Sequence, residues 1–353
     1  MSAAPNAVTP FAAARLAVAP LAVTLGDPAG IGPEIVAAAW AALRASGPVF
    51  LAVGDARTLA AAGAPVAVIA GATEAGARFS EALPVLDAPL SSIPVLGLPS
   101  AEAAPFVVRW IEAAVELALG GQASGVVTAP IAKATLYEAG FAYPGHTEFI
   151  GELTRGHPMA GARGPVMMLA AGDLRAALVT VHEPLARVPA LVTEDRIVST
   201  GMVVAEALSR DFGIARPRLV VAGLNPHAGE GGALGREDLD VVAPAVTALL
   251  ARGVDARGPL PADSLFHAAA RATYDAALCL YHDQALIPVK MLDFWGGVNL
   301  TLGLPIVRTS PDHGTAFDIA GKGLARPDSL IAAIRLAAEI AARRHAGAAV
   351  AAG

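Results

Sequence analysis

Hydrophobic segments of strand length alternate with segments of helical periodicity along most of this 353-residue chain. We predict strands over 20–25, 49–53, 66–70, 125–131, 218–224 and 276–281. We predict one helix that opens at Pro33, where proline is tolerated at the first helical position, and others over 56–62, 103–119, 194–212, 238–252 and 328–345. This alternation is typical of a largely parallel sheet covered by helices, so the sequence predicts the α/β class.

Four segments interrupt the alternation. Residues 166–181 contain two apolar runs around a central Gly-Asp pair, which predicts an antiparallel hairpin within the largely parallel design. Residues 71–100 are rich in glycine, proline and serine and predict a loop with short extended pieces, and residues 297–307 predict an extended segment. Residues 1–16 are small and apolar, but their one basic residue, Arg15, comes late, so we predict a disordered tail and no signal peptide.

Composition excludes several classes of function. Acidic residues outnumber basic ones by 31 to 25 and no lysine or arginine cluster occurs, so we expect no nucleic-acid partner. Glycine, proline or charge interrupts every apolar run before ~20 residues, which argues against a membrane span. The single Cys279 permits no intramolecular disulfide, and its apolar surroundings predict a buried packing role. Together these features predict a cytoplasmic protein of about two domains.

Three histidines close apolar strands. His182 and His282 end theirs, and His227 lies three residues past the segment RLVVAGL. Because the carboxyl ends of parallel strands share one edge, where ligands bind in open α/β folds, these residues can converge. Three neutral imidazoles with an open fourth position form the ligand set of a catalytic metal site. The alternative is that some of the eight histidines are simply satisfied near the core, but three in one setting favour a metal.

Groups suited to an anion recur near the same strand ends. They are His146 and Thr147 at a predicted helix start, Lys290, Asn299 and Arg308. Individually each can be a capping residue or a solvated charge, but together they suggest a small anionic substrate. Asp263 occupies a proline-bounded loop, where it can cap a helix, support a ligating histidine or act as a base. Lysine itself is rare, because only Lys133, Lys290 and Lys322 occur. Each lysine is therefore a candidate for a chemical role that arginine does not fill.

The glycine-rich segment GDPAGIGPE, residues 26–34, lies between a strand and a helix but does not fit the G-x-G-x-x-G fingerprint. No acidic residue follows about twenty positions later in the required context, so a Rossmann domain is not supported. Two further glycine-rich segments, 225–238 and 312–323, can present backbone N–H groups to a phosphate.

Several motifs together resemble the 4-hydroxythreonine-4-phosphate dehydrogenase family of pyridoxal phosphate biosynthesis. They are LGDPAGIGPE, GHTEF, GLNPHAGEGGALGRED, GPLPADSLF, YHDQALIPVK and GVNLTLGLPIVRTSPDHGTAFDIAGKG, within residues 20–340. GIGPE and HGTAFDIAGKG are also similar to motifs of the isocitrate and isopropylmalate dehydrogenase fold, which binds NAD without a Rossmann fingerprint. The resemblance implies two α/β/α subdomains with a cleft between them. The first, on the NAD side, would comprise 17–133 plus 305–347, and the second, with the metal, substrate and dimer interface, 134–304.

The resemblance also implies roles for individual residues. One divalent cation, Zn²⁺, Co²⁺ or Mg²⁺, would bind His182, His227 and His282, in a homodimer whose metal ligands come from both subunits. The substrate would contact His146, Thr147, Lys290, Asn299 and Arg308. NAD, or NADP, would lie against His313, Gly314, Thr315 and Asp318. Lys290 and Asp263 are our candidates for proton transfer. The chain differs from several members in a longer segment at 156–164, which includes His157, expected at the surface, and in Glu183, for which a supporting role is open.

These assignments predict NAD-dependent and metal-dependent oxidation of 4-phosphooxy-L-threonine to 2-amino-3-oxo-4-phosphooxybutanoate. That product would lose carbon dioxide to give 3-amino-2-oxopropyl phosphate, on the route to pyridoxine 5′-phosphate and vitamin B6. One alternative is the same chemistry on D-threonate or D-erythronate 4-phosphate, because a single pocket residue can decide between such substrates. Alternatives of other classes are non-redox phosphoryl or acyl transfer and a small-anion binding protein with a structural metal.

Overall fold

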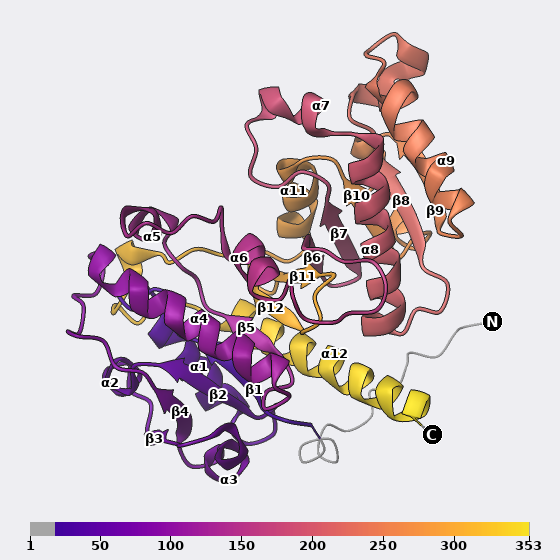
Figure 1. The fold of residues 1–353 in the computed structure, drawn as a ribbon. Helices are drawn as coiled ribbons and strands as arrows, with labels where there is room; N and C mark the ends of the chain where they lie inside the picture. Colours follow the sequence, from indigo (N-terminus) through magenta and orange to yellow (C-terminus); the bar gives the residue numbers. More distant parts are fainter. Residues whose placement is uncertain (1–17, 353) are drawn as a thin grey trace.

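The computed structural model describes residues 18–352, with side chains to 348 (Figure 1). The strands are β1 Leu21–Thr24, β2 Phe50–Gly54, β3 Val66–Val68, β4 Leu83–Asp87, β5 Val126–Thr128, β6 Val166–Ala171, β7 Leu174–Leu178, β8 Arg218–Ala222, β9 Asp255–Leu260, β10 Ala276–Cys279, β11 Val298–Leu302 and β12 Arg308–Pro311. The helices are α1 Gly32–Leu43, α2 Ala56–Ala61, α3 Ala75–Arg78, α4 Ala104–Leu119, α5 Lys133–Glu138, α6 His146–Leu153, α7 Val188–Leu191, α8 Glu194–Phe212, α9 Ala243–Ala251, α10 Ala268–Arg271, α11 His282–Leu292 and α12 Asp328–Ala352. The predicted tail, residues 1–16, lies outside the described part of the chain.

The strands of the described residues form one 12-stranded sheet in the order β3-β4-β2-β1-β5-β12-β11-β6-β7-β10-β8-β9. Neighbouring strands are parallel except at β12–β11, β11–β6 and β6–β7. The predicted antiparallel hairpin is therefore confirmed as β6 and β7, and the α/β class is confirmed with it. The six strands on one side of the β12–β11 junction come from the predicted first subdomain, and the other six come from the second. Figure 1 shows the two halves as separate lobes.

Several predicted elements differ from those observed. Residues 71–100, predicted as a loop with short extended pieces, contain one such piece, β4, which lies between β2 and β3 in the sheet, but they also contain the short helix α3, which was not predicted. The predicted extended segment 297–307 ends early because Gly303, with φ of +72°, turns the chain after β11, and β12 begins only at Arg308. The helix α11 and strand β9 were not predicted. Both carry proline, Pro288 in α11 and Pro259 in β9, which weakens a helical or strand pattern in the sequence.

Buried apolar side chains cover both faces of the central strands, as a sheet covered by helices on two sides requires. Cys279 is fully buried in β10, which confirms its packing role, and burial raises the pKa of its thiol well above the ordinary range. Among the described residues, no helix is long and apolar enough to cross a membrane.

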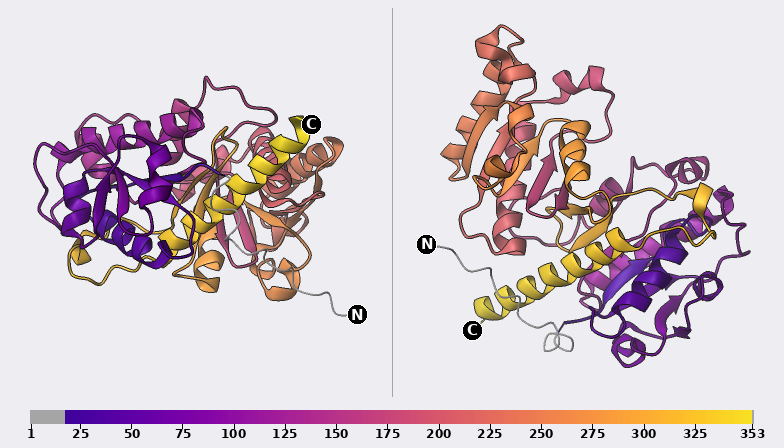
Figure 2. Two further views of the ribbon diagram at one scale, coloured as in Figure 1. Left: turned by 90° about the horizontal axis from the view of Figure 1, so that it is seen from below. Right: turned by 180° about the vertical axis from the view of Figure 1, so that it is seen from behind.

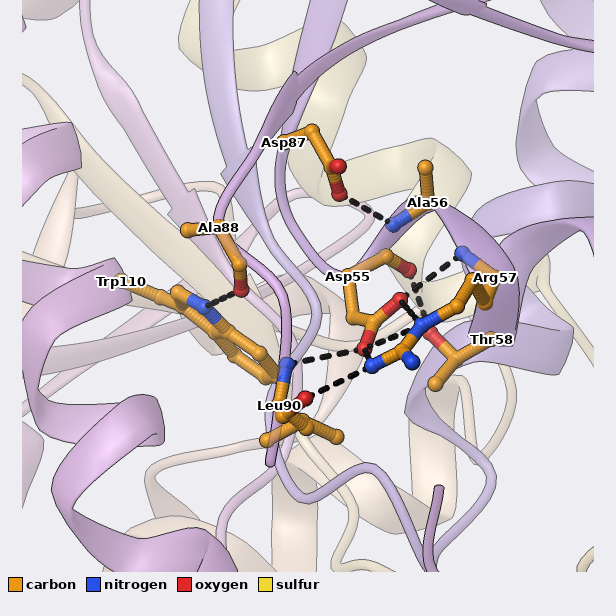
Figure 3. A network of polar contacts seen from close by, with 8 residues as sticks. All are labelled: Asp55, Ala56, Arg57, Thr58, Asp87, Ala88, Leu90 and Trp110. Atoms are coloured by element: carbon orange, nitrogen blue, oxygen red, sulfur yellow. Dashed lines mark hydrogen bonds and ion pairs between the residues drawn. The ribbon is translucent and has the colours of Figure 1, made fainter. Parts of the chain in front are cut away.

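Asp55 joins the carboxyl end of β2 to the segment that follows β4 (Figure 3). Its buried carboxylate accepts a hydrogen bond from the Arg57 backbone N–H at 2.8 Å, which caps α2. It also accepts from the Leu90 N–H at 2.9 Å, while the Arg57 guanidinium donates to the Leu90 carbonyl at 2.7 Å. Seven residues later, the Gly97 N–H donates to the Ala29 carbonyl at 2.8 Å. These bonds hold the 91–99 loop against the GDPAGIGPE segment.

The C-terminal helix α12 connects the two lobes, as the view from behind in Figure 2 shows. It packs against β12 in one half of the sheet and against α8 in the other. At the end of α8, the buried Asp211 carboxylate accepts hydrogen bonds from Arg210 and from Arg344 of α12, at 2.7–3.0 Å. Burial raises the pKa of Asp211, but these two guanidinium groups outweigh that effect and hold the pKa below its ordinary value.

Replacing Asp211 by asparagine should lower the free energy of unfolding by about 3 kcal/mol at neutral pH, because it leaves two guanidinium groups without their buried partner. The folded-state pKa lies below the unfolded value of about 3.9, so the stabilisation is present above that pH and disappears as pH falls through the folded-state pKa. Urea unfolding of both proteins from pH 7 into acid measures this difference, which should shrink in acid. Asp240→Asn, which breaks an exposed pair with Arg236, is the matched control and should cost less than about 1 kcal/mol. A difference for Asp211→Asn that grows toward acid would contradict the account.

Candidate functional site

A cavity of about 150 Å³ lies where the segments after β5 and β12 meet the start of α6. Asn299 of β11 pairs with Ser310 of β12, so their side chains share the sheet face on which the cavity lies. The lining residues are Thr128, Ala129, Pro130, Ile131, Lys133, Gly145, His146, Thr147, Glu148, Met167, Val181, His182, Asn299, Arg308, Ser310, Pro311, His313 and Gly314. Of the five residues predicted to contact substrate, the cavity brings together four: His146, Thr147, Asn299 and Arg308.

Arg308 is the deepest cation in this cavity, with 3% of its surface exposed. Its two terminal nitrogens donate to the hydroxyls of Thr301 and Thr128, at 2.9 and 2.7 Å, but its Nε has no partner. Burial lowers the pKa of Arg308 to about 10, while Glu148 opposes that shift, so the guanidinium remains charged at neutral pH. No carboxylate of the described residues lies within ion-pair distance of it. A buried cation without a counter-charge is costly, which favours an anionic ligand here.

His146 begins α6, as predicted, and Gly145 occupies the N-cap position without a side-chain cap. The free backbone N–H groups at this helix start are suited to an anion. Burial, followed by the charges of Arg308 and Lys133, lowers the pKa of His146 well below its ordinary value, so the imidazole is neutral.

Buried polar atoms without partners concentrate at this cavity. Among the described residues there are four such side-chain atoms, and three of them belong to cavity-lining residues: His146 Nε2, Asn299 Oδ1 and Arg308 Nε. Buried polar groups are normally hydrogen-bonded, so orphaned groups that line one cavity indicate a polar ligand.

The three strand-ending histidines follow three neighbouring strands. The strand β10 lies between β7 and β8 and is parallel to both, so the carboxyl ends that precede His182, His282 and His227 share one edge, as predicted. The rings of His182 and His282 lie side by side, with centroids 5.6 Å apart. The His282 Nδ1 contacts the Asp283 carboxylate at 2.7 Å, which fixes that ring and leaves its Nε2 available. Burial, then the charges of Lys133 and His282, lower the pKa of His182 to about 4, so its imidazole is neutral at pH 7.

His227 does not join this pair. It lies exposed in the turn Pro226–Gly232, where five consecutive residues from His227 to Gly231 have positive φ. Asp238 is fully buried beside this turn and accepts hydrogen bonds from the N–H groups of Leu224 and Asn225. Within the part of the chain that is described, no three histidine, cysteine or carboxylate side chains stand close enough to hold one metal ion. The assignment of His182, His227 and His282 as ligands of one metal ion therefore stays a prediction, and the described chain by itself brings only His182 and His282 together.

The two residues predicted for proton transfer lie away from the cavity lining. Lys290, in the last turn of α11, forms an ion pair with the Asp312 carboxylate at 2.9 Å and also donates to the Asp312 carbonyl. Asp263 is exposed inside the short helical turn Ala262–Ser264 and is not its cap. Their catalytic roles, and the contact of Lys290 with substrate, stay predictions.

Lys133 is a charged residue of the cavity lining that the sequence did not assign to the site. It begins α5, five residues after the end of β5, and its Nζ lies 3.4 Å from His182 Nδ1. Glu148, in the first turn of α6, was also not assigned although it lines the cavity. The one available signal for Lys133 was the rarity of lysine in this chain.

Of the residues predicted to face the nicotinamide cofactor, His313 and Gly314 line the cavity. The neighbouring Thr315 carbonyl accepts a hydrogen bond from Ile31 N–H at 3.0 Å, which joins this loop to GDPAGIGPE. Asp318 is exposed in the short helical turn Phe317–Ile319. This cofactor set stays a prediction. In the two places where the chain differs from several family members, His157 is exposed, as expected, and Glu183 pairs with Arg187 at 3.4 Å.

Comparisons with known proteins agree with this arrangement. The model of the family described as "Pyridoxal phosphate biosynthetic protein PdxA" matches residues 47–337. The 4-hydroxythreonine-4-phosphate dehydrogenase of Caulobacter vibrioides is 67% identical over 327 residues, which cover 92% of this chain and 98% of that protein. The crystal structure of 4-hydroxythreonine-4-phosphate dehydrogenase from Klebsiella pneumoniae is 41% identical with a TM-score of 0.80, and covers 92% of this chain and 99% of its own.

A relative named for different chemistry shares the fold. The terephthalate 1,2-cis-dihydrodiol dehydrogenase of Burkholderia xenovorans is 30% identical with a TM-score of 0.61, and the match covers 91% of this chain and 98% of that one. The similarity therefore extends over nearly the whole length of each of these proteins. On this evidence, and as the motifs predicted, the chain belongs to the pyridoxal phosphate biosynthetic protein PdxA family.

Proposed function

We propose that this protein oxidises the C3 hydroxyl of 4-phosphooxy-L-threonine, with NAD or NADP as hydride acceptor and a divalent cation in the site. The product, 2-amino-3-oxo-4-phosphooxybutanoate, loses carbon dioxide to give 3-amino-2-oxopropyl phosphate for pyridoxine 5′-phosphate synthesis. Membership of the family and the names of its close relatives support a dehydrogenase with this substrate. The observation that carries the proposal is the group of orphaned polar atoms that line the cavity beside the two histidines.

The phosphate of the substrate fits the deep end of this cavity. Arg308 offers an unpartnered Nε–H and a positive charge, and the start of α6 offers backbone N–H groups. Neutral His146 can donate from Nε2 to a phosphate oxygen, because burial and two nearby cations disfavour its charged form. Holding the phosphate here fixes one end of a flexible chain and so orients its reacting carbon.

The chemistry of His182 and His282 fits two ligand positions of a divalent cation. Both are strand-end imidazoles, His182 is neutral, and Asp283 orients His282. Such an ion supplies Lewis-acid stabilisation of negative charge on the C3 oxygen. We propose that the missing ligand is His227 of a second copy of the chain, in a homodimer whose active site lies at the subunit interface.

The cofactor is proposed to lie along the 313–318 loop. His313 and Gly314 border the substrate cavity, and an added Cβ at Gly314 would meet no atom within 4 Å, so this backbone is open to a ligand. A bound nicotinamide accepts the hydride from C3. The same proposal assigns the NAD side to a first subdomain, 17–133 plus 305–347, the substrate and metal to a second, 134–304, and the enzyme to the cytoplasm.

The test is NADH formation by purified protein with NAD and 4-phosphooxy-L-threonine, beside a chelated sample and one supplied with D-threonate 4-phosphate. We expect turnover with the amino-acid phosphate, its loss on chelation, and its return when a divalent cation is added. Turnover with the sugar acid alone would overturn the substrate assignment while keeping the mechanism. A complete absence of NADH with both substrates would overturn the redox function in favour of non-redox chemistry or simple anion binding.

A further inference from the structure

Lys133 is the one lysine of the described residues that lines the cavity. The others are Lys290, paired with Asp312, and the exposed Lys322 in the loop that follows β12. Lys133 is half-buried at the start of α5, and its Nζ lies 3.4 Å from His182 Nδ1 and 3.5 Å from where a Cβ on Gly145, next to His146, would lie. Its ammonium group therefore lies between the phosphate end of the cavity and the histidine pair.

The Lys133 ammonium lies near one carboxylate, that of Glu148, without forming an ion pair with it. No ion pair joins it to a carboxylate of the described residues. A Cβ built on Gly145, the N-cap of α6, would lie 3.5 Å from its Nζ and 3.3 Å from Glu148 Oε2, so the ammonium lies at the positive end of this helix, near the Glu148 carboxylate. Its one polar contact at hydrogen-bond distance among the described residues is with His182 Nδ1, at 3.4 Å. Together with Arg308, the cavity thus holds two unpaired cations at different places, against one lining carboxylate, Glu148.

We infer that Lys133 binds the carboxylate of the substrate, while Arg308 and the start of α6 bind its phosphate. This inference rests on the proposed function, because 4-phosphooxy-L-threonine carries these two anionic groups at opposite ends of a four-carbon chain. With the phosphate at Arg308 and the carboxylate at Lys133, the C3 hydroxyl lies between the two ends, on the side of His182 and His282. Lys133 is thereby a substrate-binding residue that sets the orientation of the bound substrate in the cavity.

The role differs from the one predicted for Lys290. The Lys290 ammonium already has the Asp312 carboxylate and carbonyl as partners, so an incoming carboxylate would compete with them. Lys133 has only the weak, 3.4 Å contact to His182 to exchange. Lys133 can therefore form a charge-assisted hydrogen bond to a carboxylate while losing only this weak contact.

The test is calorimetric binding, without nucleotide, of 4-phosphooxy-L-threonine and of its C1 carboxamide, which keeps the phosphate and loses the carboxylate charge. For Lys133→Met we expect the Kd of the acid to rise about tenfold to a hundredfold, and the Kd of the carboxamide to match that of the wild type. For Lys133→Arg, which keeps the charge, the Kd of the acid should lie between the value for the wild type and the value for Lys133→Met. Lys322→Met is the matched control for loss of one lysine and should bind both ligands as the wild type does.

Equal weakening of both ligands in Lys133→Met, or no weakening of either, would overturn the inference. A carboxylate-specific loss in Lys290→Met in its place would overturn it as well. If Lys133→Met does not fold, the ratio of the two Kd values in Lys133→Arg decides, since an unchanged ratio excludes contact with the carboxylate. Failure of the proposed function looks different: the wild type itself would then bind neither the acid nor the carboxamide.

Discussion

Replacing Arg308 by methionine is expected to lower kcat/KM for the phosphorylated substrate by about 10²- to 10³-fold while leaving the fold intact. The guanidinium is buried, charged at neutral pH, and has an Nε–H with no partner in the protein. A charge-assisted hydrogen bond to phosphate contributes about 1.5–3 kcal/mol, and a desolvated cavity strengthens the attraction of the charge itself. Both are lost with methionine, which preserves most of the volume of the side chain.

The same substitution should change stability little. Methionine removes two hydrogen bonds, to Thr128 and Thr301, but it also removes a buried charge that has no counter-charge. Steady-state kinetics and a thermal melt without ligand measure the two effects, and Tm should stay within about 5 °C of the wild type. Arg252→Met, at an exposed position after α9, is the control. Wild-type kcat/KM in Arg308→Met would contradict the phosphate assignment.

Mixing two inactive variants, His182→Ala and His227→Ala, is expected to restore activity. Each substitution alone should leave less than about 1% of the wild-type rate, because each removes one proposed ligand of the cation. His182 and His282 stand together in one chain, whereas His227 lies apart in a left-handed turn. If a second copy supplies His227, a mixed dimer contains one site with all three histidines. Free exchange of subunits makes about half of the dimers mixed, so about a quarter of all sites recover.

The measurement is NADH formation after the two variants are unfolded and refolded together, with metal content determined on the same samples. Refolding each variant by itself is the control and should restore nothing. A mixture that stays inactive, although each variant binds its full share of metal, would show that one chain supplies every ligand.

Much of the fold follows from local patterns that the sequence displays openly. Strands such as β1 and β2 are buried on both faces and appear as uninterrupted apolar runs, and the Gly172 turn marks the antiparallel hairpin. The order of the strands in the sheet does not follow from these local patterns, because it depends on pairing between strands that are far apart in the sequence. Thus β12, the strand that carries Arg308, joins β5 after an intervening lobe of some 180 residues. A short polar strand such as Arg308–Pro311 has no apolar signal of its own.

The site was predicted in part for the same physical reasons. His146 and Thr147 at a helix start, and Asn299 and Arg308 from neighbouring strands, line one cavity, where strand ends and helix starts place them. Residue type alone could not show whether Lys290 or Lys133 lines the cavity, because both are lysines. The position of Lys290 depends on the packing of α11, whose last turn lies against Asp312. The separation of His227 from the other two histidines depends on a turn with positive φ at His227 and Ala228. Non-glycine residues rarely adopt this conformation, so the sequence does not predict it.

The central claim is that hydride leaves C3 of 4-phosphooxy-L-threonine for a nicotinamide within this cavity. The most direct measurement uses substrate deuterated at C3 and follows the label into the nucleotide by mass spectrometry. The account predicts one deuterium per reduced nucleotide, slower turnover than with unlabelled substrate if hydride transfer limits the rate, and no labelled nucleotide from the chelated enzyme. Reduced nucleotide that forms without deuterium, or substrate consumed with no reduced nucleotide, would contradict the account.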